Sequence, residues 1–272
     1  MPTQFQTRIS GRFRDLKAKK AGGLVVYLTA GDPNLDATGE LLTALDRAGA
    51  DVIELGVPFS DPLADGPVIQ RASERALQAG TTLRKILDRV IEWRELVQAP
   101  IILFSYFNPI LQYGLENFAE RAAQVGVDGA LIVDLTADEA DEYVEVMRAH
   151  HLDTVFLASP TSTDARLQRA AELSTGFLYL ISRTGVTGER TEMAGTGREL
   201  AERARKFTRL PLAVGFGIST PQQVQEVQPY AEAAVVGSAV VHTIEDRFAE
   251  EGPQAIERFV RLLKHGTEAP SA

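Results

Sequence analysis

Three carboxylates lie close together in the segment ELGVPFSDPLADGP, residues 54–67. Glu54 interrupts an apolar run near its carboxyl end, and strand alternation places its side chain on the same side as Val52. A buried carboxylate is costly unless it is paired or used. Glu54 is therefore a candidate acid–base residue, the alternative being a rim carboxylate that its neighbours satisfy. Asp65 is a second candidate, although aspartate before glycine is common in turns, and Asp61 better suits a structural or interface role.

Three glycine-containing segments follow the last expected strands: GVTG (185–188), GFGIS (215–219) and VVGSA (235–239). Glycine lets backbone N–H groups approach an anion closely, and a helix N-terminus adds a favourable dipole. Each segment alone is weak evidence, because glycine commonly ends strands. Together, after consecutive strands, they favour a phosphate site in which Ser238 opens the following helix.

The residue types also exclude several chemistries. There is no cysteine, so disulfides, thiolate nucleophiles and cysteine-based metal sites are absent. No lysine falls at the end of an expected strand, which argues against a Schiff-base aldolase. The histidines do not converge, because His150 and His151 precede the fifth strand and His242 lies in a late helix. We expect no metal site, although a Mg²⁺ ion held by carboxylates alone stays an open alternative.

Charge and hydropathy restrict the possible partners. The 272 residues carry a net charge of −9 at pH 7, which argues against nucleic-acid binding because that relies on Lys and Arg neutralising phosphates. No apolar run approaches the roughly 20 residues needed to span a bilayer. The N-terminal segment also lacks the apolar core of a secretory signal. We expect a soluble, cytoplasmic protein that binds a small phosphorylated substrate and neither nucleic acid nor membrane.

Short apolar runs alternate with amphipathic stretches along the whole chain, which predicts parallel strands covered by helices. The expected strands are Leu24–Thr29, Asp51–Leu55, Pro100–Ser105, Gly129–Asp134, Thr154–Ala158, Gly176–Ser182, Leu212–Phe216 and Ala233–Gly237. The clearest expected helices are Ala37–Ala48, Leu83–Val97, Leu115–Val125, Ala137–His150 and Asp164–Leu173. Candidate N-caps are Asp36 and either Thr163 or Asp164, and Gly49 and Gly126 are expected to end helices.

Eight strands with intervening helices and no composition break predict an α/β fold, a (β/α)₈ TIM barrel. A doubly wound open sheet is the alternative, because periodicity does not reveal closure. Phe5, Ile9, Phe13 and Leu16 have helical spacing, which adds an N-terminal helix. We predict a single domain over residues 1–266 and a disordered tail over residues 267–272.

Several motifs carry a resemblance to a known family. In chain order they are LTAGDP from Leu28, ELGVPFSDPLADGPVIQ from Glu54, NPIL from Asn108, SRTGVTG from Ser182, and the GFGIS and VVGSA segments. The chain resembles the α subunits of tryptophan synthase over about residues 24–242. The resemblance implies a TIM barrel and a carbon–carbon lyase that cleaves indole-3-glycerol phosphate into indole and glyceraldehyde 3-phosphate.

Residue by residue, the resemblance implies that Glu54 is the general acid–base residue and that Asp65 acts at the indole nitrogen. It implies that Tyr179 positions Glu54 and the substrate. The positions matched to phosphate binding are Gly188, Gly217, Gly237 and Ser238. The positions matched to the indole pocket are Tyr27, Phe104, Tyr106, Thr187 and Phe216.

The resemblance also implies a partner and a moving segment. It implies an α₂β₂ heterotetramer, in which this chain has no cofactor and a β subunit carries pyridoxal phosphate. Asp61, Pro62, Asn108 and Pro109 match positions at the interface with that subunit. The polar, glycine-rich segment 183–197 resembles a lid in which Thr187 contacts Asp65, whereas its composition alone suits an ordinary surface loop equally well. Thr136 and Ala137 depart from the family pattern at the rim that faces the partner.

Three other functions compete with this interpretation. A free-standing lyase would release indole without a β partner. Another phosphate-binding barrel, such as a sugar-phosphate isomerase, would not need Glu54 and Asp65 in this frame. A non-catalytic barrel would have no physical need for a buried rim carboxylate.

Overall fold

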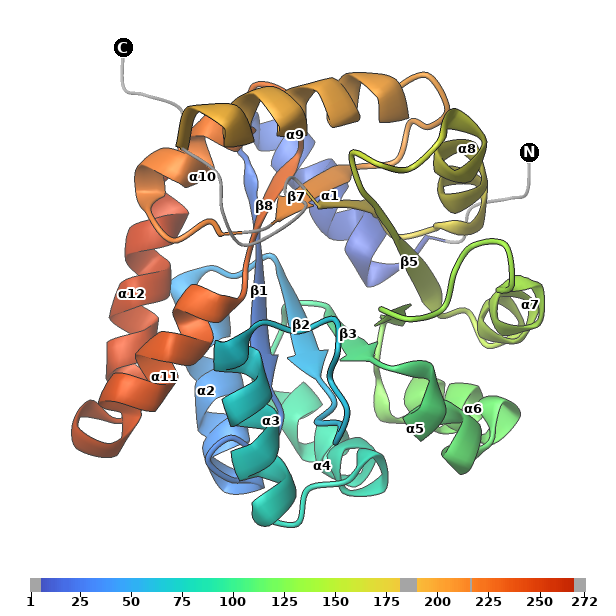
Figure 1. Ribbon diagram of the computed structural model, residues 1–272. Helices are drawn as coiled ribbons and strands as arrows, with labels where there is room; N and C mark the ends of the chain where they lie inside the picture. Colours follow the sequence, from blue (N-terminus) through green and yellow to red (C-terminus); the bar gives the residue numbers. More distant parts are fainter. Residues whose placement is uncertain (1–5, 182–189, 216, 267–272) are drawn as a thin grey trace.

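The computed structural model describes residues 6–181, 190–215 and 217–266 (Figure 1). Eight parallel strands pair in sequence order and β1 also pairs with β8, so the sheet is closed. The strands are β1 Gly23–Thr29, β2 Val52–Gly56, β3 Ile101–Ser105, β4 Gly129–Ile132, β5 Asp153–Ala158, β6 Leu178–Ile181, β7 Leu212–Gly215 and β8 Ala233–Val236. The expected (β/α)₈ barrel is confirmed, and the open-sheet alternative is wrong.

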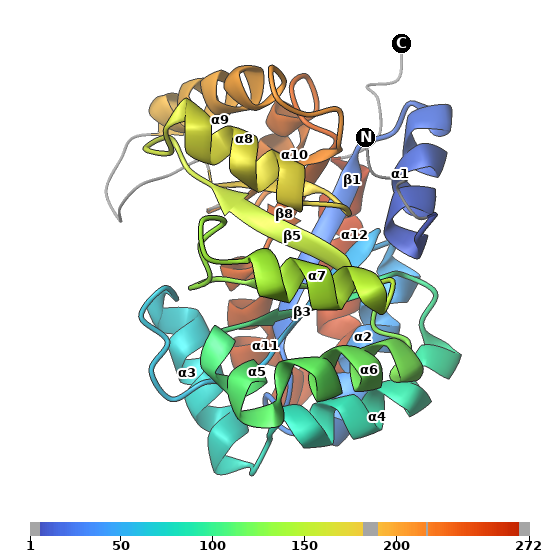
Figure 2. The same cartoon turned by 90° about the vertical axis from the view of Figure 1, so that its right-hand side faces the viewer.

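Helices surround this barrel (Figures 1 and 2). They are α1 Arg8–Lys19, α2 Leu35–Ala48, α3 Pro67–Gln78, α4 Leu83–Leu96, α5 Phe107–Tyr113, α6 Leu115–Val125, α7 Asp141–Ala149, α8 Asp164–Leu173, α9 Arg190–Ala204, α10 Pro221–Val227, α11 Ser238–Glu251 and α12 Pro253–His265. Gly49 and Gly126 end α2 and α6 in the left-handed conformation, as expected. No helix in the described ranges is long and apolar enough to cross a membrane.

Strand alternation sorts the apolar side chains into two cores. Outward residues such as Ile53 and Leu55 pack beneath the helices, whereas Val52 joins the barrel interior. The N-terminal helix α1 closes one end of that interior, where Phe13 contacts Phe177 with ring centroids 5.9 Å apart. In Figure 2, α1 lies at the right, where β5 begins, and α3 lies at the left, toward which β5 points. The carboxyl ends of the strands are therefore at the end of the barrel opposite α1.

Two local predictions were wrong, and a third, which left two N-caps open, is now decided. The N-cap of α2 is Asn34, whose side chain accepts the N–H of Ala37 at 2.9 Å, and Asp36 lies in the first turn. Thr163 is the N-cap of α8, as one of the two alternatives proposed. Helix α7 begins at Asp141 rather than at residue 137, because the preceding residues form a turn in which the Glu139 N–H donates to the carbonyl of Thr136 at 3.1 Å.

The segment that resembles a lid is helical in the part that the structure describes. Helix α9 begins at Arg190, so residues 190–197 are helical. Residues 183–189 lie outside the described part of the chain, and so do Phe5 and the tail over residues 267–272.

Candidate active site

Glu54 lies inside the barrel, two residues before the end of β2. Its side chain faces the interior in the layer above Val52, and it pairs in register with Tyr27 on β1 and Ile102 on β3. The residue is 1 % exposed, and its Oε1 has no hydrogen-bond partner among the described residues. This burial raises the pKa of Glu54 to about 8. Glu54 therefore holds a proton near neutral pH and can donate it.

Aromatic side chains form the walls around this carboxyl group. Tyr27 and Phe104 meet edge to face with ring centroids 5.2 Å apart. A Cβ at Gly56 would collide with the Tyr27 hydroxyl, so the glycine on the next strand makes room for this ring. The family resemblance matched both aromatic residues to the indole pocket, but the role of Gly56 was not predicted. The sequence feature that could have indicated this role is a glycine at the end of a buried strand, when the neighbouring strand carries a tyrosine that faces the barrel interior.

Tyr179 on β6 lies against Gly215 on β7, as Tyr27 on β1 lies against Gly56 on β2. A Cβ at Gly215 would collide with the Tyr179 hydroxyl. Burial is the main cause that raises the pKa of Tyr179, and the charge of Glu54 adds to it. No hydrogen bond joins Tyr179 to Glu54 in the described part of the chain. The structure therefore brings the two predicted residues into one electrostatic environment without a direct bond.

Asp65 lies in the loop between β2 and α3, where several hydrogen bonds hold it. Its N–H donates to the carbonyl of Pro62 at 3.0 Å, and its own carbonyl accepts from Gln70 Nε2 at 2.9 Å. The hydroxyl of Tyr106 donates to Asp65 Oδ2 at 3.1 Å and accepts the N–H of Ala64 at 2.9 Å. The family resemblance assigned Tyr106 only to the pocket lining, and Gln70 was not predicted to have a role. The contact with Tyr106 depends on the tertiary fold, because Tyr106 is 41 residues away from Asp65 in the chain, whereas Gln70 is only 5 residues away.

The protonation of Asp65 differs from that of Glu54. Partial burial raises the pKa of Asp65 to about 6, and the bond from Tyr106 opposes that increase. Asp65 is consequently mostly ionised at pH 7, where Glu54 is mostly protonated. Two carboxyl groups with separated pKa values are typical of an acid paired with an electrostatic stabiliser.

Three of the predicted phosphate residues, Gly217, Gly237 and Ser238, lie after β7 and β8, which are neighbouring strands. Gly217 has a φ of 76°, a left-handed conformation that favours glycine. Gly237 is the N-cap of α11, and the exposed Ser238 is its first residue. The first N–H groups of such a helix have no partner within it and suit an anion. Gly188, Thr187 and Phe216 lie outside the described residues.

The loop that carries Asp65, residues 57–66, is named the acid loop. Of the residues matched to a partner interface, Asp61 and Pro62 lie in the acid loop, and Asn108 and Pro109 lie in α5. Asp61 and Asn108 are exposed, while Pro62 and Pro109 are partly buried. The acid loop contacts the N-cap residue of α5, since the ring centroids of Phe59 and Tyr106 lie 4.9 Å apart. Two apolar side chains on this surface are also open to solvent: Leu63 is 95 % exposed and Leu111 is 54 % exposed.

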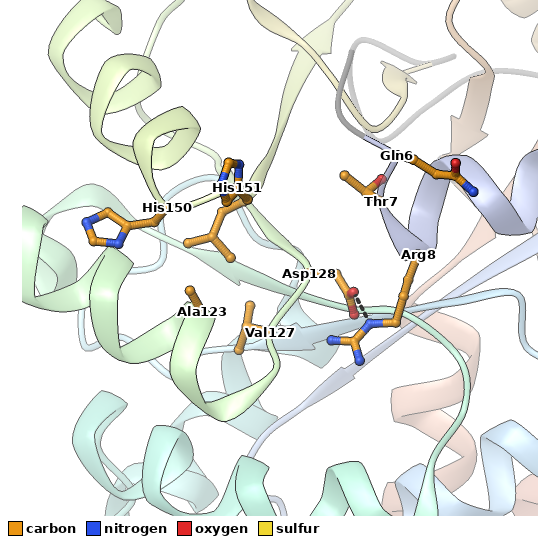
Figure 3. A pocket seen from close by; sticks show the side chains of 9 residues that line it. Gln6, Thr7, Arg8, Ala123, Val127, Asp128, His150 and His151 are labelled. Carbon is orange, nitrogen blue, oxygen red and sulfur yellow. Dashed lines mark hydrogen bonds and ion pairs between the residues drawn. The ribbon is translucent and has the colours of Figure 1, made fainter. Parts of the chain in front are cut away.

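A separate cavity lies at the other end of the barrel (Figure 3). Its volume is about 410 Å³, and its lining includes Thr7, His150 and His151. Arg8 and Asp128 form an ion pair at 2.5 Å along its wall. Barrel enzymes place their chemistry at the carboxyl ends of the strands. This cavity, beside α1, is therefore not the candidate active site.

Comparison with known proteins assigns the family. The family model described as "Tryptophan synthase alpha chain" matches residues 13–269. The curated tryptophan synthase alpha chain of Solibacter usitatus is 53 % identical over 262 residues, covering 96 % of this chain and 98 % of that protein.

Solved structures agree with this assignment. The tryptophan synthase subunit alpha of Legionella pneumophila superposes with a TM-score of 0.89 at 35 % identity, covering 97 % of this chain and 99 % of that one. A chain of Mycobacterium tuberculosis tryptophan synthase has the same TM-score and identity, covering 97 % and 100 % of the two chains. The chain therefore belongs to the tryptophan synthase α chain family.

Proposed function

We propose that Glu54 and Asp65 carry out the α reaction of tryptophan synthase at the mouth of this barrel. The reaction cleaves indole-3-glycerol phosphate into indole and glyceraldehyde 3-phosphate, and it makes the chain a lyase of tryptophan biosynthesis. The observation that carries the proposal is the environment of Glu54, a carboxyl group 1 % exposed among aromatic side chains with a pKa near 8. Such a group can donate a proton at neutral pH.

Carbon–carbon cleavage needs an electron sink, because an aromatic ring carbon is a poor leaving group. Glu54 delivers a proton to ring carbon 3, and the indole becomes iminium-like. The bond to the side chain then breaks as the adjacent hydroxyl loses its proton, which Glu54 accepts. Asp65 stays ionised and stabilises the positive charge that develops at the ring nitrogen. The proton count balances, since Glu54 ends as it began.

The geometry supports distinct roles for the other residues. Tyr27, Phe104 and Tyr179 form the apolar wall that raises the pKa of Glu54, and with Phe216 and Thr187 we assign them to the indole pocket. Tyr106 orients Asp65 through its hydroxyl. Gly217, Gly237 and Ser238, with Gly188, are assigned to the phosphate, which backbone N–H groups can hold without a cationic side chain.

A β subunit is the proposed partner, in an α₂β₂ assembly that receives the indole. In this family the α chain works without a cofactor, and pyridoxal phosphate belongs to the β subunit. Asp61, Pro62, Asn108 and Pro109 form the proposed contact surface, and the exposed Leu63 and Leu111 support it, since exposed apolar groups mark interaction sites. The substrate and the cysteine-free sequence suit a cytoplasmic location. This surface favours the synthase subunit over a free-standing lyase.

Replacing Glu54 by Gln tests the acid–base role. The variant keeps the shape of the side chain but has no proton to give or take, so the cleavage rate should fall by about 10²–10⁴-fold. Indole release from indole-3-glycerol phosphate measures this, with glycerol phosphate affinity as the control for an intact site. Retention of more than a tenth of the wild-type rate contradicts the role.

A further inference from the structure

Helix α3 directly follows the acid loop and is hydrogen-bonded to it. The loop ends at Gly66, and α3 begins at the next residue, Pro67. One turn into the helix, Gln70 Nε2 donates to the carbonyl of Asp65 at 2.9 Å. Any shift of α3 along its axis must therefore carry the backbone of Asp65 with it.

Arg75 fastens this helix to two other parts of the barrel. Its guanidinium makes two parallel bonds of 2.8 Å to the carboxylate of Asp32, which follows β1 and is 2 % exposed. The same guanidinium donates through Nη1 to Glu245 Oε1 on α11 at 2.8 Å. Bidentate arginine–carboxylate pairs have a defined geometry as well as attraction. We name Asp32, Arg75 and Glu245 the α3 clamp.

The clamp lies over a small apolar contact that reaches the pocket. Ala72 of α3 and Val241 of α11 pack against Tyr27, the inward tyrosine beside Glu54. Helix α11 begins at Ser238, where the phosphate is proposed to bind. The α3 clamp thus connects three parts of the barrel. These are α3, which follows Asp65, α11, whose first residues are proposed to bind the phosphate, and the segment after β1, the strand that carries Tyr27.

Glu245 also lies near His242 and Asp246, with donor atoms within 4.8 Å of one another. Both oxygens of Glu245 are already bonded to arginine, since Arg71 reaches Oε2 at 2.6 Å and Arg75 reaches Oε1. These bonds, that from Arg71 first, hold the pKa of Glu245 at about 2. The cluster is therefore an ion-pair network and not a metal site.

We propose that Arg75 is a positioning residue for this reaction: through the α3 clamp and Gln70, it sets the distance of Asp65 from the phosphate-binding end of α11. The inference rests on the proposed function, because it assumes that Asp65 and the start of α11 hold opposite ends of one substrate. Misplacement of a reacting group by about 1 Å can cost on the order of 10²-fold in rate.

Arg75→Met tests the proposal, with Arg121→Met as its matched control. Arg121 has the same side-chain exposure, 32 %, and pairs at 2.8 Å with Asp88 on a neighbouring helix, without contact to the acid loop. The full-length variants are compared for kcat of indole release and for Kd of glycerol 3-phosphate. We expect Arg75→Met to lower kcat between ten- and a hundredfold with Kd within twofold, and Arg121→Met to leave both within twofold.

The double variant Asp32→Asn with Arg75→Met separates the effect of Arg75 on the position of Asp65 from its effect on the stability of the fold. Removing Arg75 alone leaves the buried Asp32 carboxylate unpaired, which lowers the melting temperature. The added Asn removes that charge, so the melting temperature should recover while kcat stays low. Recovery of kcat together with stability overturns the proposal, as does an Arg75→Met kcat equal to that of Arg121→Met. A wild type that releases no indole contradicts the proposed function instead.

Discussion

At the scale of single residues, two carboxyl groups of one site are kept in opposite protonation states. Glu54 is buried among aromatic rings and has no partner for Oε1 among the described residues, so desolvation raises its pKa to about 8. Asp65 is less buried and accepts a hydrogen bond from Tyr106, so its pKa rises only to about 6. The difference comes from burial and bonding and not from the residue type.

The pH dependence of cleavage should follow these two groups. The proposed mechanism requires ionised Asp65 and protonated Glu54, so kcat/KM should rise through a pKa near 6 and fall through a pKa near 8. Steady-state cleavage of indole-3-glycerol phosphate between pH 5 and pH 9 measures the profile. A rate that keeps rising above pH 8 contradicts a protonated Glu54 as the donor.

Tyr106→Phe should move the acidic limb of that profile. The hydroxyl of Tyr106 stabilises the charged form of Asp65, so its loss raises the pKa of Asp65 and shifts the limb to higher pH. Tyr113→Phe is the control and should leave the limb in place, because Tyr113 is the last residue of α5 whereas Tyr106 is the N-cap of that helix. Equal profiles for the two variants would show that the Tyr106 bond does not tune Asp65.

Glu54 should also make folding stability depend on pH. Its folded pKa is raised from 4.5 to about 8, so the folded chain binds the extra proton between these values and the free energy of unfolding falls as pH rises through them. Glu54→Gln removes this dependence. Relative to wild type, the variant should gain on the order of 4 kcal/mol between pH 4 and pH 9. Denaturant unfolding at the two pH values measures it, and a parallel pH dependence in both proteins contradicts burial of a neutral Glu54.

At the scale of elements, the starts of α3 and α11 perform different tasks with similar caps. Gly66 precedes α3 and Gly237 precedes α11, and neither cap has a side-chain hydrogen bond. The start of α3 follows the acid loop, whereas the start of α11 is proposed to present its N–H groups to the phosphate. The helix dipole favours an anion at such an end by up to about 2 kcal/mol.

Gly237→Ala should weaken phosphate binding without unfolding the chain. A Cβ at Gly237 would meet Tyr27 at 3.5 Å or more, an ordinary contact distance, so the ligand-free fold has room for it. The methyl group should keep the phosphate from the backbone and raise the Kd of glycerol phosphate by about ten- to thirtyfold. Gly66→Ala, where a Cβ would meet nothing within 4 Å, is the matched control. Titration calorimetry with glycerol phosphate measures the Kd of both variants. Equal Kd values would show that Gly237 is not part of the phosphate site.

At the scale of the whole molecule, the two ends of the barrel are not equivalent. Helix α1 fills the end where the strands begin, with Ile9, Phe13 and Leu16 in the interior core. The acids, the proposed phosphate site and the exposed Leu63 and Leu111 lie at the other end. An indole released there emerges beside the surface proposed for the β subunit.

Leu111→Asp should weaken association with a tryptophan synthase β subunit. A buried apolar contact would be replaced by a charge that must lose its water, so the Kd of the complex should rise at least about tenfold. Leu262→Asp, on α12 away from this surface, is the control, because Leu262 has the same exposure of 54 %. Titration of each variant with the β subunit, read as binding and as stimulation of indole release, measures the effect. Equal binding by the two variants places the partner elsewhere.

The sequence alone determined the elements and the direction of their side chains. Alternation along β2 correctly placed Glu54 inside the barrel with Val52, and apolar runs located all eight strands to within about two residues. Motif resemblance identified the family that the comparisons confirmed. The assigned residue roles stay predictions. Local patterns were least reliable where turns compete with helices, as at residues 137–140 before α7.

Only the tertiary structure decided the closure of the barrel, the protonation states of Glu54 and Asp65, and the ion pairs that hold α3 in place. Closure requires the pairing of β1 with β8, more than 200 residues apart, and no local period encodes it. The pKa values of Glu54 and Asp65 depend on burial by side chains from other strands. The bond from Arg75 to Asp32 joins residues 43 positions apart. Propensity and periodicity act over a few residues, whereas desolvation and ion pairing depend on which distant segments meet.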